Sequence, residues 1–254
     1  MIPRQARALV LPVAVLLALE VWTRMVHLQS DALAPPSAVA AAMAEAFSDG
    51  TILIATRDTL TAAFAGLVTG GGVGLALGIA LGLIRVLDRL MEATIEALRP
   101  IPSIALLPIA LIALGFGYRM EIVIIGFACI WPMLILSRAA VRDIEPRLIE
   151  VARALRLSAT DRVTKIILPA ALPRIFLAFR LTAGIAVIVA VTVEITINPI
   201  GLGAGIMTAQ QALRPDLMLA YLVWIGIVGS ALNSTLLLAQ RRWFGRAALI
   251  GAPA

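Results

Sequence analysis

Long apolar runs dominate the pattern of hydrophobic and polar positions along the chain. A membrane-spanning helix needs about 20 mostly apolar residues, and six stretches of the sequence approach that length with few charges. We therefore predict an all-α, polytopic membrane protein with about six transmembrane helices. The predicted spans are residues 8–26, 58–84, 100–118, 121–141, 172–197 and 217–240.

The first apolar stretch has two interpretations. Arg4 and Arg7 precede it, and Ala32-Leu33-Ala34 resembles the small-residue site at which a signal peptide is cleaved. That site lies well beyond the apolar run and is followed by Pro35-Pro36, which disfavours cleavage. We favour a retained helix, so residues 1–57 are predicted to form an N-terminal transmembrane helix and an outer linker.

The composition supports a membrane protein. Of the 254 residues, 61% are hydrophobic and 14% are charged, whereas soluble domains are about 45–50% apolar and about 25% charged. These proportions argue against a soluble enzyme, a disordered chain and a nucleic-acid-binding module. The single cysteine excludes an intrachain disulfide, and with one histidine no histidine-based metal site is expected.

The net charge of +6 is explained by membrane topology. Cytoplasmic segments of membrane proteins are enriched in Lys and Arg. If the N-terminus is cytoplasmic and six helices alternate, all but four of the 21 Lys and Arg residues fall on the cytoplasmic side. We therefore expect both termini in the cytoplasm and no nucleic-acid partner. The four outer residues are Arg24, Arg57, Arg119 and Arg214.

Glycine recurs at every fourth position of the second predicted span. This spacing clears one face of a helix, so that the backbone of a neighbouring helix can approach closely. We favour packing within one bundle, and the alternative is a moving or subunit-facing surface. The glycines are Gly66, Gly70, Gly74, Gly78 and Gly82.

Polar and helix-breaking residues in the third and fifth spans are candidates for a translocation path. Pro100, Pro102 and Pro108 interrupt the third span, and interrupted helices often line substrate paths, although proline also suits the first turn of a helix. Because a carboxylate at membrane depth is costly, Glu194 should face protein or water. We predict a path or outer-gate role, the alternative being an interfacial carboxylate that reaches water. The candidate path residues are Ser103, Glu194, Thr196 and Asn198.

The longest cytoplasmic segment, residues 142–171, is far longer than a turn requires. Pro146 suits the first turn of a helix, and Ser158-Ala159-Thr160-Asp161 is a variant of the capping box that starts another. Pro169 and Pro173 are expected to mark the entry to the fifth span. We predict a helix-turn-helix unit that docks a cytoplasmic partner. Its apolar face is predicted to comprise Leu148, Ile149, Ala152 and Leu155.

The same segment resembles the signature of ABC-importer permeases, which is E-A-A, three residues, Gly, nine residues and I-x-L-P. The spacing is kept throughout, with Val151 in place of Ala and Arg156 in place of Gly. The runs P-I-P-S-I-A-L-L-P-I, L-G-F-G and G-L-G, which begin at Pro100, Leu114 and Gly201, are similar to those of the nitrate/alkanesulfonate/taurine/bicarbonate permease group.

The resemblance implies a type I ABC-importer permease-like bundle that works as a homodimer in the bacterial inner membrane. Each copy would dock one cytoplasmic ATPase subunit through coupling helices at about 145–170, and a periplasmic or lipid-anchored solute-binding protein would deliver the solute. This chain would be non-catalytic, without cofactor or metal, because ATP and Mg would be bound by the ATPase. The implied docking residues are Glu150, Ala152, Arg153, Leu155, Arg156, Ser158, Ile166, Leu168 and Pro169.

The domain organisation that follows is a permease core over residues 58–245 and a cytoplasmic tail over 246–254. The resemblance leaves the solute open among sulfonates, taurine, nitrate, bicarbonate, vitamin precursors and aromatic carboxylates. A proton-driven secondary transporter with Glu194 as its relay is a less favoured alternative, because the other carboxylates of spans two to six lie at helix ends. A scaffold or membrane-enzyme subunit is disfavoured because no reactive constellation or soluble head is visible.

Overall fold

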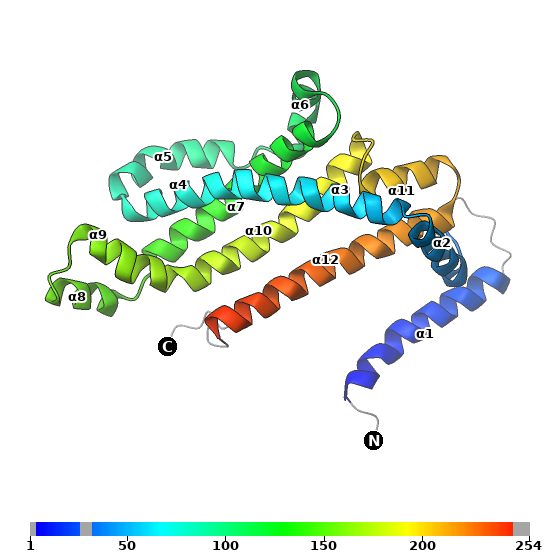
Figure 1. Ribbon diagram of the computed structural model, residues 1–254, viewed down its shortest axis with the longest axis horizontal. Helices are drawn as coiled ribbons and strands as arrows, with labels where there is room; N and C mark the ends of the chain where they lie inside the picture. Colours follow the sequence, from blue (N-terminus) through cyan, green and yellow to red (C-terminus); the bar gives the residue numbers. More distant parts are fainter. Residues whose placement is uncertain (1–3, 26–31, 246–254) are drawn as a thin grey trace. The chain divides into compact units, whose positions relative to one another are not determined.

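The computed structural model describes residues 4–25 and 32–245, and this part of the chain is built of helices joined by short turns (Figure 1). The predicted all-α class is therefore confirmed, while the predicted tail over 246–254 lies outside the described residues. The helices are α1 (Arg4–Met25), α2 (Pro36–Ser48), α3 (Thr51–Gly66), η1 (Leu67–Gly71), α4 (Gly72–Leu83), α5 (Arg85–Leu98), η2 (Ser103–Leu106), α6 (Leu107–Leu114), α7 (Tyr118–Arg142), α8 (Pro146–Ala154), α9 (Ala159–Arg162), η3 (Val163–Ile167), α10 (Leu168–Thr196), α11 (Leu202–Gln211) and α12 (Pro215–Phe244).

Four helical stretches of the described residues are long and apolar enough to cross a membrane. They are Thr51–Leu83, Tyr118–Arg142, Ala159–Thr196 and Pro215–Phe244. They contain the second, fourth, fifth and sixth predicted spans except for the last residue of the second and the last residue of the fifth. The first predicted span forms the helix α1 as far as Met25, but α1 is not among these four stretches. The chain is thus a multi-helix membrane protein, as the apolar runs predicted.

The third predicted span is wrong in its outline. Residues 85–98, expected in a cytoplasmic connection, form the amphipathic helix α5, and the chain then bends by 76° before η2 and the eight-residue α6. The bend falls at Pro100 and Pro102, which lack the N–H that would continue the helical hydrogen bonds, while Arg99 still has helical backbone angles. The apolar side of α5 packs through Ile95 against Leu81 and Leu134.

The chain divides into two compact units. One contains residues up to Thr59 together with Glu194–Val228, and the other contains Leu60–Val193 and the chain from Gly229 onward. We call them the first and the second unit.

The first unit is held by aromatic packing and by hydrogen bonds at helix ends. The rings of Phe47 and Trp224 meet edge to face at 4.7 Å, and Trp224 Nε1 donates to Thr56 Oγ1 at 2.8 Å. Glu20 pairs with Arg24 at 2.5 Å and also accepts a hydrogen bond from the N–H of Ser37 at 2.9 Å. The second of these bonds satisfies a free N–H in the first turn of α2.

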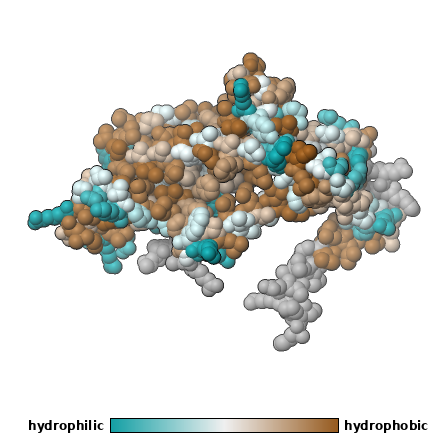
Figure 2. Space-filling model, in the orientation of Figure 1, coloured by the Kyte–Doolittle hydropathy of each residue, from teal (hydrophilic) through white to brown (hydrophobic). Residues whose placement is uncertain are grey.

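The second unit is a bundle in which α4 and α10 both pack against α7. Polar residues lie at the end that carries α8 and α9 and also near α6, while hydrophobic residues cover much of the surface of the long helices (Figure 2). This distribution fits a bundle whose long helices face hydrocarbon and whose polar regions reach water.

Candidate functional site

The glycine ladder of α3, η1 and α4 lies against α7. A Cβ placed on Gly78 would lie 2.5 Å from the carbonyl oxygen of Leu134, and one on Gly82 would lie 2.7 Å from Val141. Gly66 meets Ile125 in the same way, at 2.5 Å, and Gly70 and Gly74 face the backbone of Gly126 and Ile130. The two helix backbones are therefore in direct contact, which is packing within one chain.

A buried ion cluster, which was not predicted from the sequence, joins α5 to α7. Asp88 is 3% exposed; Arg138 Nε lies 2.6 Å from its Oδ1, and Arg142 Nη1 lies 2.5 Å from its Oδ2. The signal was available, because two arginines four residues apart at the end of an apolar helix share one face. Their partner, however, lies 50 residues away from Arg138 in the chain.

The predicted docking unit begins with α8. Pro146 occupies the first turn, as predicted, and Ala152 is 1% exposed, whereas Glu150 and Arg153 are exposed. The predicted apolar face is divided, and this is a correction: Ile149 is half-buried, but Leu155 is exposed. The face is divided because Leu148, Val151 and Leu155, spaced by three and then four residues, form an exposed apolar stripe along the outer side of α8. Such a stripe is open to a partner.

The turn after α8 keeps a left-handed residue at the position where the family signature has glycine. Arg156 has φ +49°, its N–H bonds to the Arg153 carbonyl at 2.9 Å, and the Leu157 N–H bonds to the Ala152 carbonyl at 3.0 Å. These two bonds form the Schellman motif that commonly ends helices. Arginine therefore preserves the turn, at the energetic cost of a left-handed conformation.

The second half of the docking unit is continuous with the fifth span. The Ser158 hydroxyl accepts a bond from the Asp161 N–H at 3.1 Å, so the predicted cap is confirmed. Pro169 and Pro173, however, lie inside the helix and do not interrupt its entry, which corrects the prediction. The π-helical turn η3 ends two residues before Pro169 and includes Lys165, the residue four positions before the proline. Its wider backbone relieves the clash that a proline ring makes with that carbonyl.

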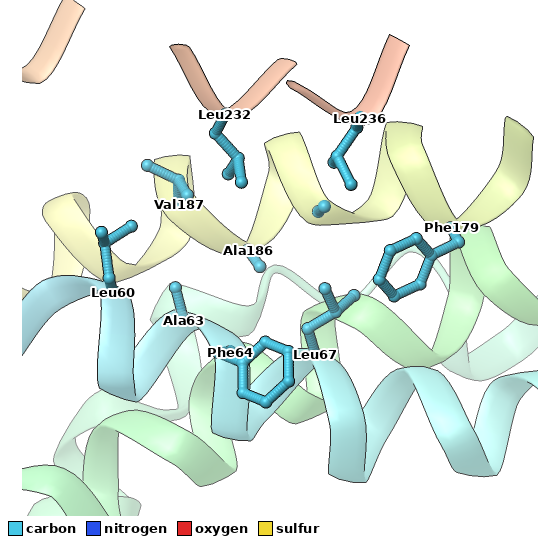
Figure 3. A pocket seen from close by; sticks show the side chains of 10 residues that line it. Leu60, Ala63, Phe64, Leu67, Phe179, Ala186, Val187, Leu232 and Leu236 are labelled. Carbon is cyan, nitrogen blue, oxygen red and sulfur yellow. The ribbon is translucent and has the colours of Figure 1, made fainter. Parts of the chain in front are cut away.

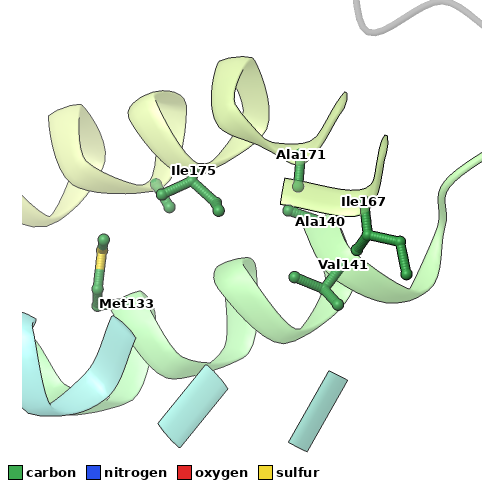
Figure 4. Packing of buried hydrophobic residues seen from close by; sticks show 7 residues of the cluster. Met133, Ala140, Val141, Ile167, Ala171 and Ile175 are labelled. Carbon is green, nitrogen blue, oxygen red and sulfur yellow. The ribbon is translucent and has the colours of Figure 1, made fainter. Parts of the chain in front are cut away.

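Buried contacts fasten the docking unit to the bundle. Ile167 of η3 and Ala171 of α10 pack with Ala140 and Val141 of α7 (Figure 4). Ile149 of α8 packs against this cluster. Among the other implied docking residues, Arg156, Ser158 and Pro169 are exposed, and Ile166 and Leu168 are half-buried. The unit therefore has an exposed outer side and an inner side that packs on α7 and α10.

Three of the four candidate path residues meet in the first unit. Glu194, Thr196 and Asn198 line a pocket of about 270 Å³ together with Thr208 and Gln211. The lining combines hydroxyl, amide and carboxylate groups and contains no cationic side chain. Ser103, the fourth candidate, lies in the second unit, half-buried at the start of η2.

Glu194 holds α11 onto the end of α10. Its carboxylate is 2% exposed and accepts a hydrogen bond at 2.8 Å from the N–H of Gly203 in the first turn of α11. This buried position does not fit the alternative in which Glu194 reaches water. Gly201 leaves room for the carboxylate, since a Cβ there would collide with it. Helix α11 itself was missed, because residues 198–216 read as a linker.

Glu194 is one of four buried carboxylates among the residues that the structure describes. Asp58, Asp88 and Glu121 are also buried, at 9%, 3% and 0% exposure. The expectation that the other carboxylates lie at helix ends holds for Glu121, which is in the first turn of α7, but is wrong for Asp58, which lies inside α3.

An entirely apolar pocket of about 250 Å³ lies between α3, α10 and α12 in the second unit. Phe64 and Leu67, Phe179 and Val187, and Leu236 point toward it from the three helices (Figure 3). Every residue of its lining is apolar, so it offers a polar solute no hydrogen bond and no charge.

Comparison with known families gives one match that covers most of the chain. Residues 70–249 match the family described as "Binding-protein-dependent transport system inner membrane component". The matched region includes most of the glycine ladder, the docking unit and the Glu194 pocket.

Individual relatives are permease proteins of ABC transport systems. The chain is 27% identical over 236 residues to the putative aliphatic sulfonates transport permease protein SsuC of Bacillus subtilis. The aligned region covers 93% of this chain and 86% of that protein. It is 36% identical over 148 residues to the bicarbonate transport system permease protein CmpB of Synechococcus elongatus, covering 58% of this chain and 53% of that one. The matches thus span most of one relative and about half of the other.

A solved structure shares the fold. The chain superposes on the inward-facing MetNI methionine ABC transporter with a TM-score of 0.67 at 22% identity, covering 75% of this chain and 95% of that one. The arrangement of helices is therefore that of an ABC importer permease.

Proposed function

Because the chain belongs to the binding-protein-dependent transport system inner membrane component family, we propose that it is the membrane-spanning permease subunit of an ATP-driven importer of a small anionic solute. The observation that carries this proposal is the exposed α8–α9 unit, which has no use in an ion-driven carrier. Its buried contacts to α7 and α10 give a cytoplasmic ATPase a place from which to move the bundle.

The chemistry of ATP belongs to the partner in this proposal. One cytoplasmic ATPase subunit docks on each copy of the chain at Glu150, Arg153, Leu155, Arg156 and Ser158, all exposed. ATP and Mg are bound by that subunit, and this chain is non-catalytic and has no cofactor. Leu148, Val151 and Leu155 supply the apolar contact area, and the flanking charges set the partner's orientation.

The complex is a homodimer of permeases in the bacterial inner membrane, with both termini in the cytoplasm and a periplasmic or lipid-anchored binding protein on the outer side. Solute crosses by alternating access: closure of the ATPases moves the docking units, and the helices pass between two arrangements of similar free energy. A ligand shifts this balance only through different affinities for the two arrangements.

The solute is a small anion such as a sulfonate, nitrate or bicarbonate, or the zwitterion taurine. Support comes from the sulfonate and bicarbonate systems named for two relatives. The carboxylate of Glu194 repels an anion, so its role is to position α11 beside the outer gate. Thr196, Asn198 and Thr208 can donate weak hydrogen bonds to a passing solute.

Co-purification of the ATPase tests the docking proposal. Glu150→Arg should strongly reduce the amount of ATPase that co-purifies, because it reverses a charge on the exposed docking face. Glu96→Arg is the matched control, since Glu96 is also exposed but lies on α5, outside the docking unit. Equal retention of the ATPase in both variants would refute docking through α8.

Transport measurements test the role of Glu194. Glu194→Gln keeps an acceptor for the Gly203 N–H but replaces a charge-assisted hydrogen bond with a weaker neutral one. Helix α11 should therefore be held less firmly beside the gate, and uptake should fall while the thermal stability changes little. Uptake at the wild-type rate would show that the carboxylate has no part in gating.

Measurement of ATP hydrolysis in reconstituted complexes tests the transporter class. Addition of loaded binding protein should raise the rate of hydrolysis, and an unchanged rate would contradict the proposed class.

A further inference from the structure

A pocket of about 440 Å³ lies in the second unit where the corner between α4 and α5 meets the docking unit (Figure 1). Arg85, Arg142 and Arg162 contribute to its lining from α5, α7 and α9. Much of the remaining wall is apolar and includes Leu83, Ile149 and Val163. The pocket therefore combines a cluster of cationic groups with a hydrophobic surface.

The positive charge of this pocket is not balanced by the described residues around it. Arg142 shares the carboxylate of Asp88 with Arg138. Arg85 and Arg162 make no ion pair within residues 4–25 and 32–245, and Asp161, the acid next to Arg162, is bound to Lys165 at 2.6 Å. No Asp or Glu of the described chain lines the pocket. Three guanidinium groups around one space repel one another unless an anion joins them.

The location of the pocket identifies the kind of anion. Leu83 ends one apolar span and Arg142 ends another, so the pocket lies at the level where hydrocarbon gives way to water. At this level basic pockets between helices bind anionic headgroups, and the apolar wall matches the first part of an acyl chain. A free inorganic anion would leave that wall uncovered.

We propose that this pocket binds an anionic phospholipid, with its phosphate between Arg85 and Arg162 and its glycerol and acyl region against Leu83, Ile149 and Val163. Such a lipid bridges the α4–α5 corner and the docking unit, which share this pocket. Its occupancy stabilises the position of α8 and α9 before any ATPase binds. This inference depends on the membrane location of the chain and is independent of the identity of the solute.

Thermal unfolding of the full-length chain in detergent, in whatever complex it purifies, tests the proposal. The readout is labelling of Cys129, which is the single cysteine of the chain and is buried. Short-chain phosphatidylglycerol, short-chain phosphatidylcholine and glycerol phosphate are titrated in parallel. Phosphatidylglycerol should raise the unfolding temperature at concentrations where the other two have little effect.

The variants decide which residues are responsible. The double variant Arg85→Gln/Arg162→Gln should weaken the phosphatidylglycerol effect about tenfold, since each basic group near a headgroup contributes a several-fold gain in affinity. Arg89→Gln/Arg241→Gln removes the same charge from exposed positions outside the pocket and should keep the wild-type response. Arg85→Lys/Arg162→Lys should retain most of it, and this variant guards against a folding defect in the glutamine pair.

Three results would overturn the proposal. The first is an equal response to phosphatidylglycerol in the wild type and the Arg85→Gln/Arg162→Gln variant. The second is an equal effect of phosphatidylcholine, which would exclude recognition of the headgroup charge. The third is an equal effect of glycerol phosphate, which would make the ligand a soluble anion.

Discussion

Replacing Gly78 with alanine provides a direct test of the contact between α4 and α7. The added Cβ would lie 2.5 Å from the Leu134 carbonyl oxygen, 2.9 Å from Ser137 Cβ and 3.1 Å from the Arg138 amide nitrogen. Ordinary contact begins at about 3.4 Å, so the helices would have to separate by about 0.9 Å at this point. The nearest obstacle is backbone and cannot rotate away.

The expected cost follows from this displacement. Overpacking a well-packed interior costs about 1–3 kcal/mol, and a gap of 0.5–1 Å removes roughly a quarter to a half of the dispersion energy of the contacts it opens. Because the separation extends along the glycine ladder, we expect a loss of about 2–3 kcal/mol in the free energy of unfolding. That corresponds to a decrease of about 4–12 °C in unfolding temperature.

Gly72→Ala is the matched control, because a Cβ on Gly72 meets nothing within 4 Å. It lies on the same helix and should raise stability by about 0.5–1 kcal/mol through the better helix propensity of alanine. The rate of Cys129 labelling during heating reports both changes, since this thiol is buried on α7. If Gly78→Ala unfolded at the same temperature as Gly72→Ala, the close backbone contact between α4 and α7 would be refuted.

Three other substitutions should change stability in a defined direction. Arg156→Gly should stabilise the docking turn by about 1 kcal/mol, because glycine adopts φ +49° without strain, and slower hydrogen exchange at the turn would show it; unchanged exchange would contradict a strained residue. Gly201→Ala should be more damaging than Gly50→Ala, because both have positive φ but only at Gly201 is the space for a Cβ filled; equal melting temperatures would mean that backbone strain alone matters. Asp88→Asn should lower the free energy of unfolding by about 2 kcal/mol, which is less than for a fully buried ion pair because the arginines that bind Asp88 are partly exposed. Glu92→Gln is the control, because its ion pair is 4.0 Å long and exposed, and it should change stability by less than about 0.5 kcal/mol. Similar losses in the two variants would disprove the special role of the buried carboxylate.

The parts of the fold that were predictable are those specified by local chemistry. Apolar runs of sufficient length located the long helices, because hydrocarbon admits little else. Pro146 and Ser158 correctly predicted the starts of two helices, because the N–H groups of a first turn have no partner within the helix. Proline lacks such an N–H, and the Ser158 hydroxyl accepts a hydrogen bond from one. These signals lie within a few residues of the feature that they predict.

The parts that were missed depend on contacts between distant segments. Helix α5 is rich in charges and read as a connection, but its apolar side is covered by α4 and α7. Asp88 and Arg138 meet across 50 residues, and Glu194 acquires its role only when α11 folds back onto α10. Pro169 is tolerated inside a helix because a π-helical turn precedes it, and no local pattern announces that turn.

The wide turn η3, Val163–Ile167, also fixes the azimuth of the docking surface. A π-helical turn holds one residue more than an α-helical turn, and each residue of an α-helix corresponds to about 100° of rotation. Deleting one residue here would let regular winding complete the same full turn, so α8 would keep its azimuth around the α10 axis, whereas deleting one residue from a regular turn of α10 would rotate α8 by about 100°. The turn η3 therefore absorbs one residue of chain length without changing the direction in which the docking surface faces.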